Sequence, residues 1–471
     1  MREFTFTGKQ KEVMAYPATG HIIVLGTAGS GKTTMALLRA KTLVSMPANN
    51  KVLLITFNRA LVKYMKKISS YTEPGLVIEH YHKFARGYLN SLGKMPAQNG
   101  ILGDELKIKF VETAVANIKS QHPNESTLKR STQFFLDEIA FIQRFGFSND
   151  EEYFDTNRIG RASANIRRDN RKWTYMVFEE YKALRENAGA MYDWDDIACY
   201  VYNELVNDVG ERKYAHIIID EGQDFSPMMI KSLVNAVKKG GSFTFFGDVA
   251  QQIYGNRLSW RDSGVNVEKV LRLEVNYRNP QTITAFANDI TKSKYWQHNE
   301  DMVTATNQIA EGPKPILVQF KNKESEMGWV VHRAETESLK SSTVIVCRSN
   351  ADIAFFEELL KKRKCKTTKI DEKTPGYTSE KTVYLATFHA VKGLEFENVF
   401  IPFLSVDKFP NANAVANTVS DDDAYANELK LLYVAATRSK YGLYMTFSQT
   451  LSPLFPERAN SYDAYSEEDL I

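Results

Sequence analysis

A glycine-rich octapeptide near the start of the chain has the residue types to bind phosphate. Residues 26–33 read GTAGSGKT and match the pattern G-x-x-x-x-G-K-[ST] in full. The glycines let backbone N–H groups surround phosphate oxygens, and the N-terminus of a following helix adds positive potential. Lys32 can supply charge to the β- and γ-phosphates, and the Thr33 hydroxyl can ligate Mg²⁺. The predicted phosphate-binding set is Gly26, Thr27, Ala28, Gly29, Ser30, Gly31, Lys32, Thr33 and Thr34.

A pair of carboxylates supplies the second half of this chemistry. Residues 217–224 read IIIDEGQD, an apolar run that ends in acids. Asp220 is predicted to hold the Mg²⁺ together with Thr33, and Glu221 to orient or deprotonate an attacking water. Taken alone, the run equally fits a strand that ends in solvated acids. With the phosphate loop upstream it indicates nucleoside triphosphate hydrolysis, although not what the energy is used for.

These motifs need elements that position them, and the chain offers two series of short apolar runs. Continuous apolar runs are typical of parallel strands buried on both faces, and strands that alternate with helices indicate an α/β sheet. Ligands of such sheets bind at the carboxyl ends of the strands. The first series is 21–26, 52–57, 216–221 and 243–248; the second is 316–320, 343–348, 382–388, 398–404 and 442–448.

The spacing of these runs predicts the domain organisation. Residues 1–85 and 206–270 are expected to form a first α/β unit, and residues 271–450 a second. Residues 86–205 are polar, aromatic and helical in pattern, which predicts an all-helical insertion in the first unit. Residues 451–471 form an acidic tail that we expect to be frayed.

Composition excludes some classes of protein. Hydrophobic residues make up 43% and charged residues 25% of the 471 residues, as in ordinary globular chains. The formal net charge is +3, so bulk charge says nothing about partners. Cys199, Cys347 and Cys365 are too few for a disulfide framework or a zinc site. Without an apolar signal core or a membrane-length apolar run, we expect a soluble, cytoplasmic protein with no membrane partner.

Further short strings in a fixed order point to a family. In chain order they are FTGKQ, GTAGSGKT, ITFNRA, HYHKF, DEGQD, GDVAQQIYGNR, NYRN, CRSN, TFHAVKGLEF and LLYVAATRSK. The set resembles the superfamily 1 helicases of the UvrD/Rep/PcrA type, over nearly the whole chain outside residues 86–205 and the tail. The resemblance implies two RecA-like parallel-sheet motor domains of the P-loop NTPase class. It also implies ATP and Mg²⁺ as cofactors, and single-stranded DNA or a single/double-strand junction as partner.

The resemblance implies roles at the nucleotide site. Gln10 looks like the residue that reads the adenine edge, Tyr277 like the aromatic that stacks on adenine, and Glu395 like the ribose-binding carboxylate. In addition, Arg278 resembles a γ-phosphate contact, Gln251 a γ-phosphate sensor, and Arg438 an arginine finger. Because the two arginines come from the second unit, they would complete the site only when the units close. An arginine finger is worth roughly 10³ to 10⁵ in rate.

A nucleic-acid track is implied in the same way. Single-strand binders combine a basic groove with aromatic faces on which bases stack. By resemblance the track is lined by Phe57, His82, Arg257, Arg348 and His389. For Phe57 and His82, core packing or a satisfied polar contact is the alternative interpretation.

Three departures from the family pattern affect these expectations. Asn256 stands where the family often has a base-stacking tryptophan, and Trp260 is the nearest substitute. Thr34 replaces an arginine often found after GKT, so adenine contacts are expected to be looser. The stretch between NYRN and TFHAVKG is little more than a motor core needs, which predicts a reduced or absent accessory domain.

Two segments of the predicted insertion leave alternatives open. In YDWDDI, residues 192–197, we expect Trp194 and Ile197 to face the core and the acids to lie outside, with a second metal site as the alternative. The basic run from Arg158 to Lys172 fits either a duplex-binding surface or a solvated face. A phosphate-contacting patch would make binding fall steeply with salt.

Three hypotheses follow. The first is an ATP-dependent translocase or helicase on single-stranded DNA, 3′ to 5′ by resemblance, whose relatives act in repair, replication restart or plasmid and phage biology. The second is a motor subunit of a larger nuclease or antiphage defence complex that unwinds weakly alone. The third is a non-motor nucleotide switch, against which Glu221, Gln251 and Arg438 argue. The residues do not separate DNA from RNA.

Overall fold

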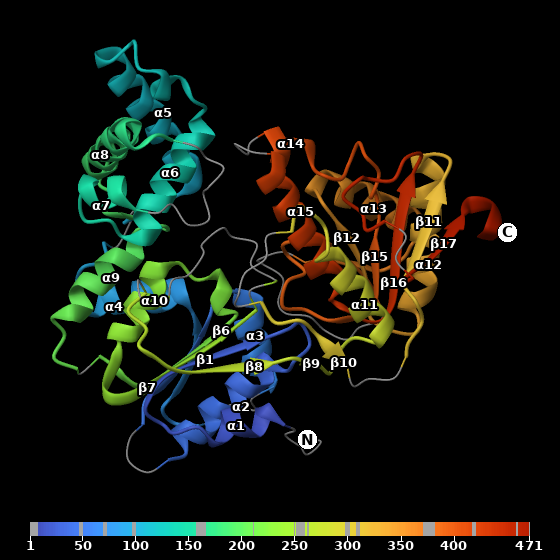
Figure 1. Ribbon diagram of the computed structural model, residues 1–471, viewed down its shortest axis with the longest axis horizontal. Coiled ribbons are helices and arrows are strands. Elements are labelled where there is room, and N and C mark those ends of the chain that lie inside the picture. The colour runs from blue at the N-terminus through green and yellow to red at the C-terminus, as the bar shows by residue number, and fades with distance from the viewer. Residues whose placement is uncertain are drawn as a thin grey trace.

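The computed structural model describes most of the chain. The described residues are 8–46, 50–68, 73–96, 100–156, 166–210, 212–248, 250, 260, 263–296, 302–307, 311–370, 382–416, 421–457 and 460–470. They form two separate parallel sheets, each covered by helices, with a group of helices standing apart from both (Figure 1). Among these residues no helix is long and apolar enough to cross a membrane.

The first sheet has six strands in the order β3-β2-β6-β7-β1-β8, and all of its pairs are parallel. Its strands are β1 (Gly20–Gly26), β2 (Val52–Thr56), β3 (Leu76–His80), β6 (Tyr214–Asp220), β7 (Val237–Gly247) and β8 (Val267–Leu273). Every residue of β2 is buried, because helices cover both faces of the sheet. The four apolar runs predicted in this unit are therefore confirmed as parallel strands.

Two layers of helices sandwich the first sheet. Helices α1 (Lys9–Ala15), α2 (Lys32–Val44) and α3 (Arg59–Ile68) share a hydrophobic core with one face. Helices α4 (Tyr81–Ser91), α9 (Ile197–Val206) and α10 (Pro227–Asn235) share a core with the other face. Much of α4 and all but the last residue of α9 fall within residues 86–205, so the ends of that segment pack on the sheet.

The second sheet has seven parallel strands in the order β13-β14-β12-β15-β16-β11-β17. They are β11 (Ile316–Phe320), β12 (Thr343–Cys347), β13 (Thr367–Lys369), β14 (Val383–Thr387), β15 (Phe396–Ile401), β16 (Ser439–Ser448) and β17 (Asp463–Ser466). Helices α11 (Gln281–Ile290) and α15 (Asp421–Ala436) pack on one face, and α12 (Lys323–Ser338) and α13 (Asn350–Lys362) on the other. All five runs predicted here are confirmed as strands.

The end of the chain differs from the frayed tail that its acidic composition suggested. β17 pairs with β11 and forms the edge of the second sheet, and the 3₁₀ helix η5 (Glu467–Leu470) follows it. Lysines on either side of β11 pair with the acids: Lys314 lies 3.3 Å from Asp463, and Lys321 lies 2.9 Å from Glu468. The prediction of a frayed tail was wrong because the acidic composition does not show the lysines near β11, far away in the chain, that pair with these acids.

The helices that stand apart have a core of their own. They are α5 (Asp104–Gln121), α6 (Thr132–Phe145), α7 (Asp150–Asp155) and α8 (Arg171–Asn187), with the 3₁₀ turns η1 (Ser126–Lys129) and η2 (Arg168–Asn170). Figure 1 shows this group above the first sheet, beside α9 and α10. A short parallel pair, β4 (Ile101–Leu102) with β5 (Tyr192–Asp193), joins its two connections to the sheet.

Two arginines of the basic run have structural partners. One guanidinium nitrogen of Arg171, Nη1, donates to the backbone carbonyls of Tyr153, Phe154 and Thr156 at the end of α7. Arg168 pairs with Asp155. In the structure these two arginines therefore bind the end of α7. Arg158 and Arg161 lie outside the described residues.

The remaining elements connect the two units or follow the second sheet. β9 (Val275–Asn276) pairs with β10 (Thr306–Asn307) between the units, η3 (Gly222–Asp224) follows β6, and α14 (Ala412–Ala416) precedes α15. From Asn279 to Thr387, the described elements other than β10 belong to the second sheet or to the helices that cover it. All three cysteines are free thiols.

Candidate nucleotide site and nucleic-acid interface

The phosphate loop lies between β1 and α2, and its backbone requires glycine at two positions. Gly29 and Gly31 have φ angles of 74° and 84°, a region that side chains disfavour. A Cβ atom on Gly29 would lie 2.2 Å from Oδ1 of Asn276 and 2.7 Å from Cβ of Arg278. The backbone N–H of Tyr277 donates to the Gly29 carbonyl at 2.9 Å. The loop therefore packs directly against the segment that leads to the second sheet.

Lys32 and Thr33 open α2 at the carboxyl end of the first sheet. The Lys32 ammonium donates to the carbonyls of Gly26 and Thr27 at 2.8 and 2.7 Å, and lies 3.5 Å from Asp248. The Thr33 hydroxyl donates to Oδ2 of Asp220 at 2.7 Å. The predicted phosphate-binding lysine and both predicted metal ligands are thus brought together from α2 and the end of β6.

The geometry around Asp220 fits a divalent cation. Asp220 is fully buried, and its Oδ1 has no hydrogen-bond partner among the described residues. Burial and the neighbouring charge of Glu221 raise the pKa of Asp220 to about 7. An unpaired buried carboxylate oxygen costs free energy unless a cation takes it. One carboxylate and one hydroxyl suit Mg²⁺, which keeps water and phosphate oxygens as its other ligands.

Glu221 follows β6 in a strained backbone conformation. Its φ is 53°, in the left-handed region that glutamate rarely adopts. The amide of Gln223 donates to Oε2 of Glu221 at 2.5 Å and fixes the carboxylate. Burial would raise the pKa of Glu221, but the charges of Lys392, Lys32 and Arg438 lower it below its ordinary value. Glu221 is therefore held as an anion, the form that can accept a proton from water.

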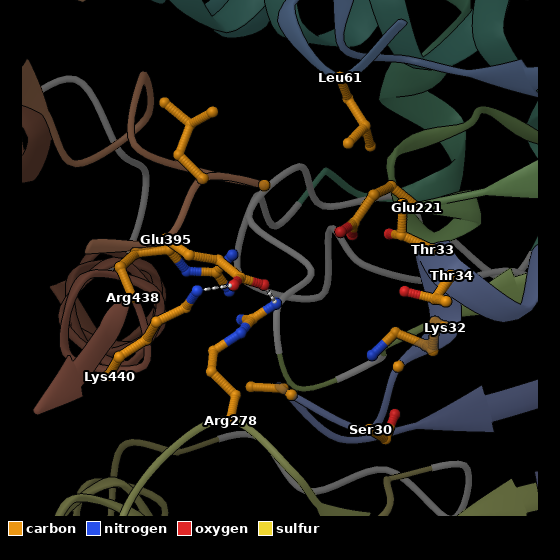
Figure 2. Close-up of a pocket in the computed structure, with 15 residues that line it drawn as sticks. Ser30, Lys32, Thr33, Thr34, Leu61, Glu221, Arg278, Glu395, Arg438 and Lys440 are labelled. Carbon is orange, nitrogen blue, oxygen red and sulfur yellow. Dashed lines mark ion pairs between the residues drawn. The ribbon is translucent and has the colours of Figure 1, made fainter. Parts of the chain in front are cut away.

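The pocket in front of these groups is lined from both sheets (Figure 2). The first unit contributes residues 28–34, Leu61 and Glu221. The second contributes Gly393, Leu394, Glu395, Arg438 and Lys440, and Arg278 reaches in from the segment after β9. A ligand in this pocket would contact both units at once, so its binding would respond to how they close.

The two predicted phosphate-contacting arginines lie in this pocket in different environments. Arg438, two residues after the end of α15, is 1% exposed, and its Nε donates to the Val434 carbonyl at 3.1 Å. Burial, followed by the charge of Arg278, lowers the pKa of Arg438 to about 10, so it stays charged at neutral pH. Arg278 pairs with Glu395, and Lys440 lies 2.9 Å from the other oxygen of Glu395. Sequence reasoning missed Lys440, although it follows Arg438 by two positions.

Glu395 is an anion under all ordinary conditions. Burial would raise its pKa, but the charges of Arg278 and Lys440 hold it at about 2. The sequence pattern assigned Glu395 and Arg278 separate roles toward ribose and phosphate. Their direct pairing joins motifs that lie far apart in the chain.

The predicted adenine-binding residues flank the phosphate loop. The Gln10 side chain is 4% exposed, and its amide donates to the Ser30 carbonyl at 3.2 Å. The Tyr277 side chain is 37% exposed beside Gly29. The structure thus places Gln10 and Tyr277 at the same loop, while Gln251 lies outside the described residues.

A buried ion pair crosses from one unit to the other. The Lys392 ammonium donates to Oδ1 of Asp224 at 2.6 Å, with side chains 8% and 5% exposed. The Asn58 amide donates to the Lys392 carbonyl at 3.1 Å. Burial, against the attraction of Lys392, raises the pKa of Asp224 to about 6. This contact joins the DEGQD and KGLEF motifs and was not predicted.

Three partly exposed aromatic rings gather where β2 and β3 end. The centroid of the His82 ring lies 5.7 Å from that of Phe57 and 5.0 Å from that of Trp194. Burial lowers the pKa of His82, so its ring is neutral at pH 7. Phe57 and His82 were predicted here from resemblance, and Trp194 was not. Flat, partly exposed rings of this kind can stack on bases.

Trp194 is partly exposed because its acidic neighbours point inward, the reverse of our expectation. Asp193 is fully buried and accepts from Tyr181 at 2.6 Å, and Asp195 lies 2.7 Å from both Lys107 and Arg144. Cations from α5, α6 and α8 neutralise these acids, and Arg185 likewise pairs with Asp196 at 2.5 Å. Ile197 is buried as predicted. Among the described residues no group of three or more His, Cys, Asp or Glu could hold a metal.

The other residues predicted to contact nucleic acid differ in exposure and in their partners. The Arg348 guanidinium binds Glu428 of α15 through Nε and Nη2, at 2.9 and 2.6 Å. His389, just after β14, is exposed. Trp260 packs edge-on against buried Phe245, with ring centroids 4.8 Å apart. Arg257 and Asn256 lie outside the described residues.

Comparison with known proteins identifies the family. The UvrD/REP helicase N-terminal domain matches residues 6–272, and the UvrD-like helicase C-terminal domain matches residues 271–375 and 369–450. The chain belongs to the UvrD/Rep family of helicases, as its motifs predicted. Its two sheets are the two RecA-like P-loop motor domains of that family.

Individual relatives are distant in sequence. A probable DNA helicase of Mycoplasma pneumoniae is 23% identical, over 90% of this chain and 80% of the relative. DNA helicase II of Haemophilus influenzae is 24% identical and that of Escherichia coli 23%, each over 75% of this chain and 49% of the relative. The chain thus spans about half the length of these DNA helicase II proteins. A solved C-terminal domain of a possible DNA helicase from Lactobacillus plantarum is 23% identical, covering 40% of this chain and 98% of that domain; its TM-score of 0.30 is too low for a structural conclusion.

Proposed function

We propose that the protein is an ATP-dependent translocase that moves 3′ to 5′ along single-stranded DNA and unwinds duplex ahead of it. One observation carries the proposal. A single pocket collects the phosphate loop and Glu221 from one unit with Arg278 and Arg438 from the other. Hydrolysis in such a pocket depends on closure of the two units, and a hydrolysis-coupled closure is what a motor needs.

The residues of the pocket divide the work of phosphoryl transfer. Mg²⁺ held by Thr33 and Asp220 would neutralise charge on the β- and γ-phosphates. Glu221 orients the attacking water and takes its proton. Lys32, Arg278 and Arg438 stabilise the charge that spreads over the transferred phosphoryl group, with Gln251 as the γ-phosphate sensor.

The remaining site residues select and hold the nucleotide. Gln10 reads the adenine edge and Tyr277 stacks on the base, while Glu395 binds the ribose. The backbone of the phosphate loop, residues 26–34, surrounds the phosphates. The hydrogen bonds of Gln10 and Tyr277 to the backbone of that loop support this assignment.

Strand binding is proposed along the carboxyl ends of both sheets. The track comprises Phe57, His82, Arg257, Arg348 and His389, and we add Trp194 because its ring lies against His82. The Asn58 amide donates to the Lys392 carbonyl, three residues after His389 and three before Glu395. Closure of the pocket would therefore shift the two parts of the track relative to each other.

A second candidate function is a motor subunit that unwinds weakly until a partner such as a nuclease joins it. One observation favours it: the described elements between Asn279 and Thr387 belong to the motor itself, apart from β10. A purified chain that translocates but does not separate strands, and does so once a partner is added, would favour this candidate.

ATP hydrolysis with and without single-stranded DNA tests the proposal. We expect DNA to stimulate the wild type, and Glu221→Gln to lower kcat by about 10² to 10⁴ while nucleotide binding survives, because only the base is lost. Glu358→Gln, in an exposed pair with Lys362 far from the pocket, serves as control. A wild type that binds ATP without turnover contradicts the motor proposal, and stimulation by RNA alone contradicts the DNA assignment.

Strand displacement on substrates with a 3′ or a 5′ tail tests the polarity. We expect unwinding only from a 3′ single-stranded tail. Unwinding from the 5′ tail contradicts the assigned direction without touching the assignment as a motor.

A further inference from the structure

Glu395 carries two counter-charges in the nucleotide pocket. Arg278 pairs with its Oε1, and the Lys440 ammonium lies 2.9 Å from its Oε2. All three residues line the same pocket, and Figure 2 shows the arginine and the lysine approaching the carboxylate from separate strands of chain. Each cation has an oxygen of its own, so one can leave without displacing the other.

The two cations differ in what else they can reach. Arg278 lies on the phosphate-loop side: a Cβ on Gly29 would approach its Cβ at 2.7 Å. Its side chain is 18% exposed, and its buried Nε has no hydrogen-bond partner among the described residues. Lys440 is the second residue of β16, two residues after Arg438, and its side chain is 39% exposed. Arg278 has spare donors beside the phosphate loop, whereas Lys440 sits at the far side of Glu395.

We propose that Lys440 is a positioning residue of the nucleotide site: it stays on Glu395 as the permanent counter-charge while Arg278 leaves Glu395 for the incoming triphosphate. This inference rests on the proposed ATPase function. A planar guanidinium binds phosphate through two parallel N–H donors, so a triphosphate competes well for Arg278. The exchange frees Oε1 of Glu395 to accept a ribose hydroxyl, and Lys440 keeps the carboxylate charged and aimed into the pocket.

Loss of Lys440 would make the exchange harder. Arg278 would then be the sole ion-pair partner of a partly buried carboxylate, and its departure would leave that carboxylate without an ion pair. Loss of Lys440 should therefore weaken nucleotide binding. It should change the rate of hydrolysis little, because a nucleotide that has bound still contacts Arg278 and Arg438. Lys440→Met should therefore raise the KM for ATP roughly 3- to 10-fold and change kcat little.

A double-mutant cycle on the full chain separates this role from a direct phosphate contact. The variants are Lys440→Met, Glu395→Gln and their combination, with steady-state KM and kcat for ATP in the presence of single-stranded DNA. Lys440→Arg tests rescue by a conserved charge. Lys314→Met is the matched control, because Lys314 forms a similar half-exposed pair with Asp463 in the second unit, away from the pocket.

The proposal expects a raised KM in Lys440→Met, near wild-type KM in Lys440→Arg and Lys314→Met, and no further rise when Lys440→Met is added to Glu395→Gln. It is overturned if Lys440→Met leaves KM unchanged, or if its effect persists at full size beside Glu395→Gln. Should the wild type bind ATP without turnover, the proposed function fails separately. In that case the affinity of each variant for a non-hydrolysable ATP analogue, measured by calorimetry, replaces KM in the cycle, and the same outcomes support or overturn the proposal.

Discussion

Residue 221 shows how a single side chain is set for chemistry. A glutamate at φ 53° is strained, and such strain persists only where surrounding contacts enforce it. The enforcing contact is Gln223, whose amide nitrogen donates to Glu221 while its amide oxygen accepts from the backbone N–H of Asp248 at 2.9 Å. The buried Gln223 thus links Glu221, the proposed general base after β6, to the end of β7.

Replacement of Gln223 by leucine should disturb catalysis more than binding. The change keeps the side-chain volume but removes both hydrogen bonds, so Glu221 loses its fixed orientation. We expect kcat for ATP hydrolysis to fall about 10-fold with KM nearly unchanged. Gln319→Leu, at an exposed amide on β11 that donates to the Gln449 carbonyl, is the control. An unaltered kcat in Gln223→Leu would show that Glu221 does not depend on this contact.

Local motifs explain which site residues the sequence could predict. Lys32 and Thr33 lie in one loop, and Asp220 and Glu221 end one strand, so pattern and position suffice. The pairing of Glu395 with Arg278 and Lys440 depends on how distant segments of the second unit fold together, and no spacing rule predicts it. Resemblance supplied Glu395 and Arg278 as separate contacts, and Lys440 had no motif to mark it.

Strands could be predicted where burial on both faces of the sheet requires a continuous run of apolar residues. All nine predicted strands are present. The edge strands β3, β8, β13 and β17 were missed because they are only partly buried or too short for such a run. The prediction that the acids of residues 192–197 face solvent was wrong for a different reason. The rule that acids face solvent fails where buried cations from other helices pair with them.

A helix cap beside the proposed track predicts a pH dependence of stability. Nδ1 of His80 accepts from the backbone N–H of Lys83 at the N-terminus of α4, which requires an unprotonated ring nitrogen. Burial, and next the charge of Arg59, lower the pKa of His80 to about 4. Because this lies below the unfolded value near 6.5, the stability contributed by His80 is present above pH 6.5 and is lost as the pH falls toward 4.

Urea unfolding at pH 7.5 and pH 5 measures this contribution. Allowing for its partial exposure, we expect His80 to account for about 1 kcal/mol of the stability lost between the two values. His80→Asn keeps a good capping acceptor that does not titrate, so it should lose less stability on acidification. His80→Ala should be weaker already at pH 7.5. Equal acid sensitivity in wild type and His80→Asn would contradict the assignment.

At the scale of the whole molecule, the pocket exists only while the two motor units face each other. Most of the contacts described between them are polar: the Tyr277–Gly29 hydrogen bond, the Asn58–Lys392 hydrogen bond and the Lys392–Asp224 ion pair. Polar interfaces within a chain tend to open and close. The ion pair is the most buried of these contacts, so the closed arrangement should be most sensitive to it.

Asp224→Asn should shift the molecule toward the open arrangement. Breaking a buried pair leaves the Lys392 charge uncompensated and costs about 3 to 5 kcal/mol. Because the pair joins the two units, that cost falls on closure rather than on either sheet. We expect a larger radius of gyration in small-angle scattering, faster protease cleavage between the units, and a lower kcat for ATP. Asp155→Asn, in the exposed pair with Arg168, should change none of these.

The double variant decides whether the charge itself is responsible. Asp224→Asn combined with Lys392→Met removes the unpaired ammonium, so the closed arrangement should recover in scattering and proteolysis. The rate should not recover, since Lys392 is the charge that contributes most to the lowered pKa of Glu221. A double variant as open as Asp224→Asn would mean that closure depends on the shape of this contact and not on its charge. Recovery of closure without recovery of rate would instead separate two roles of Lys392, one in holding the units together and one in keeping Glu221 ionised.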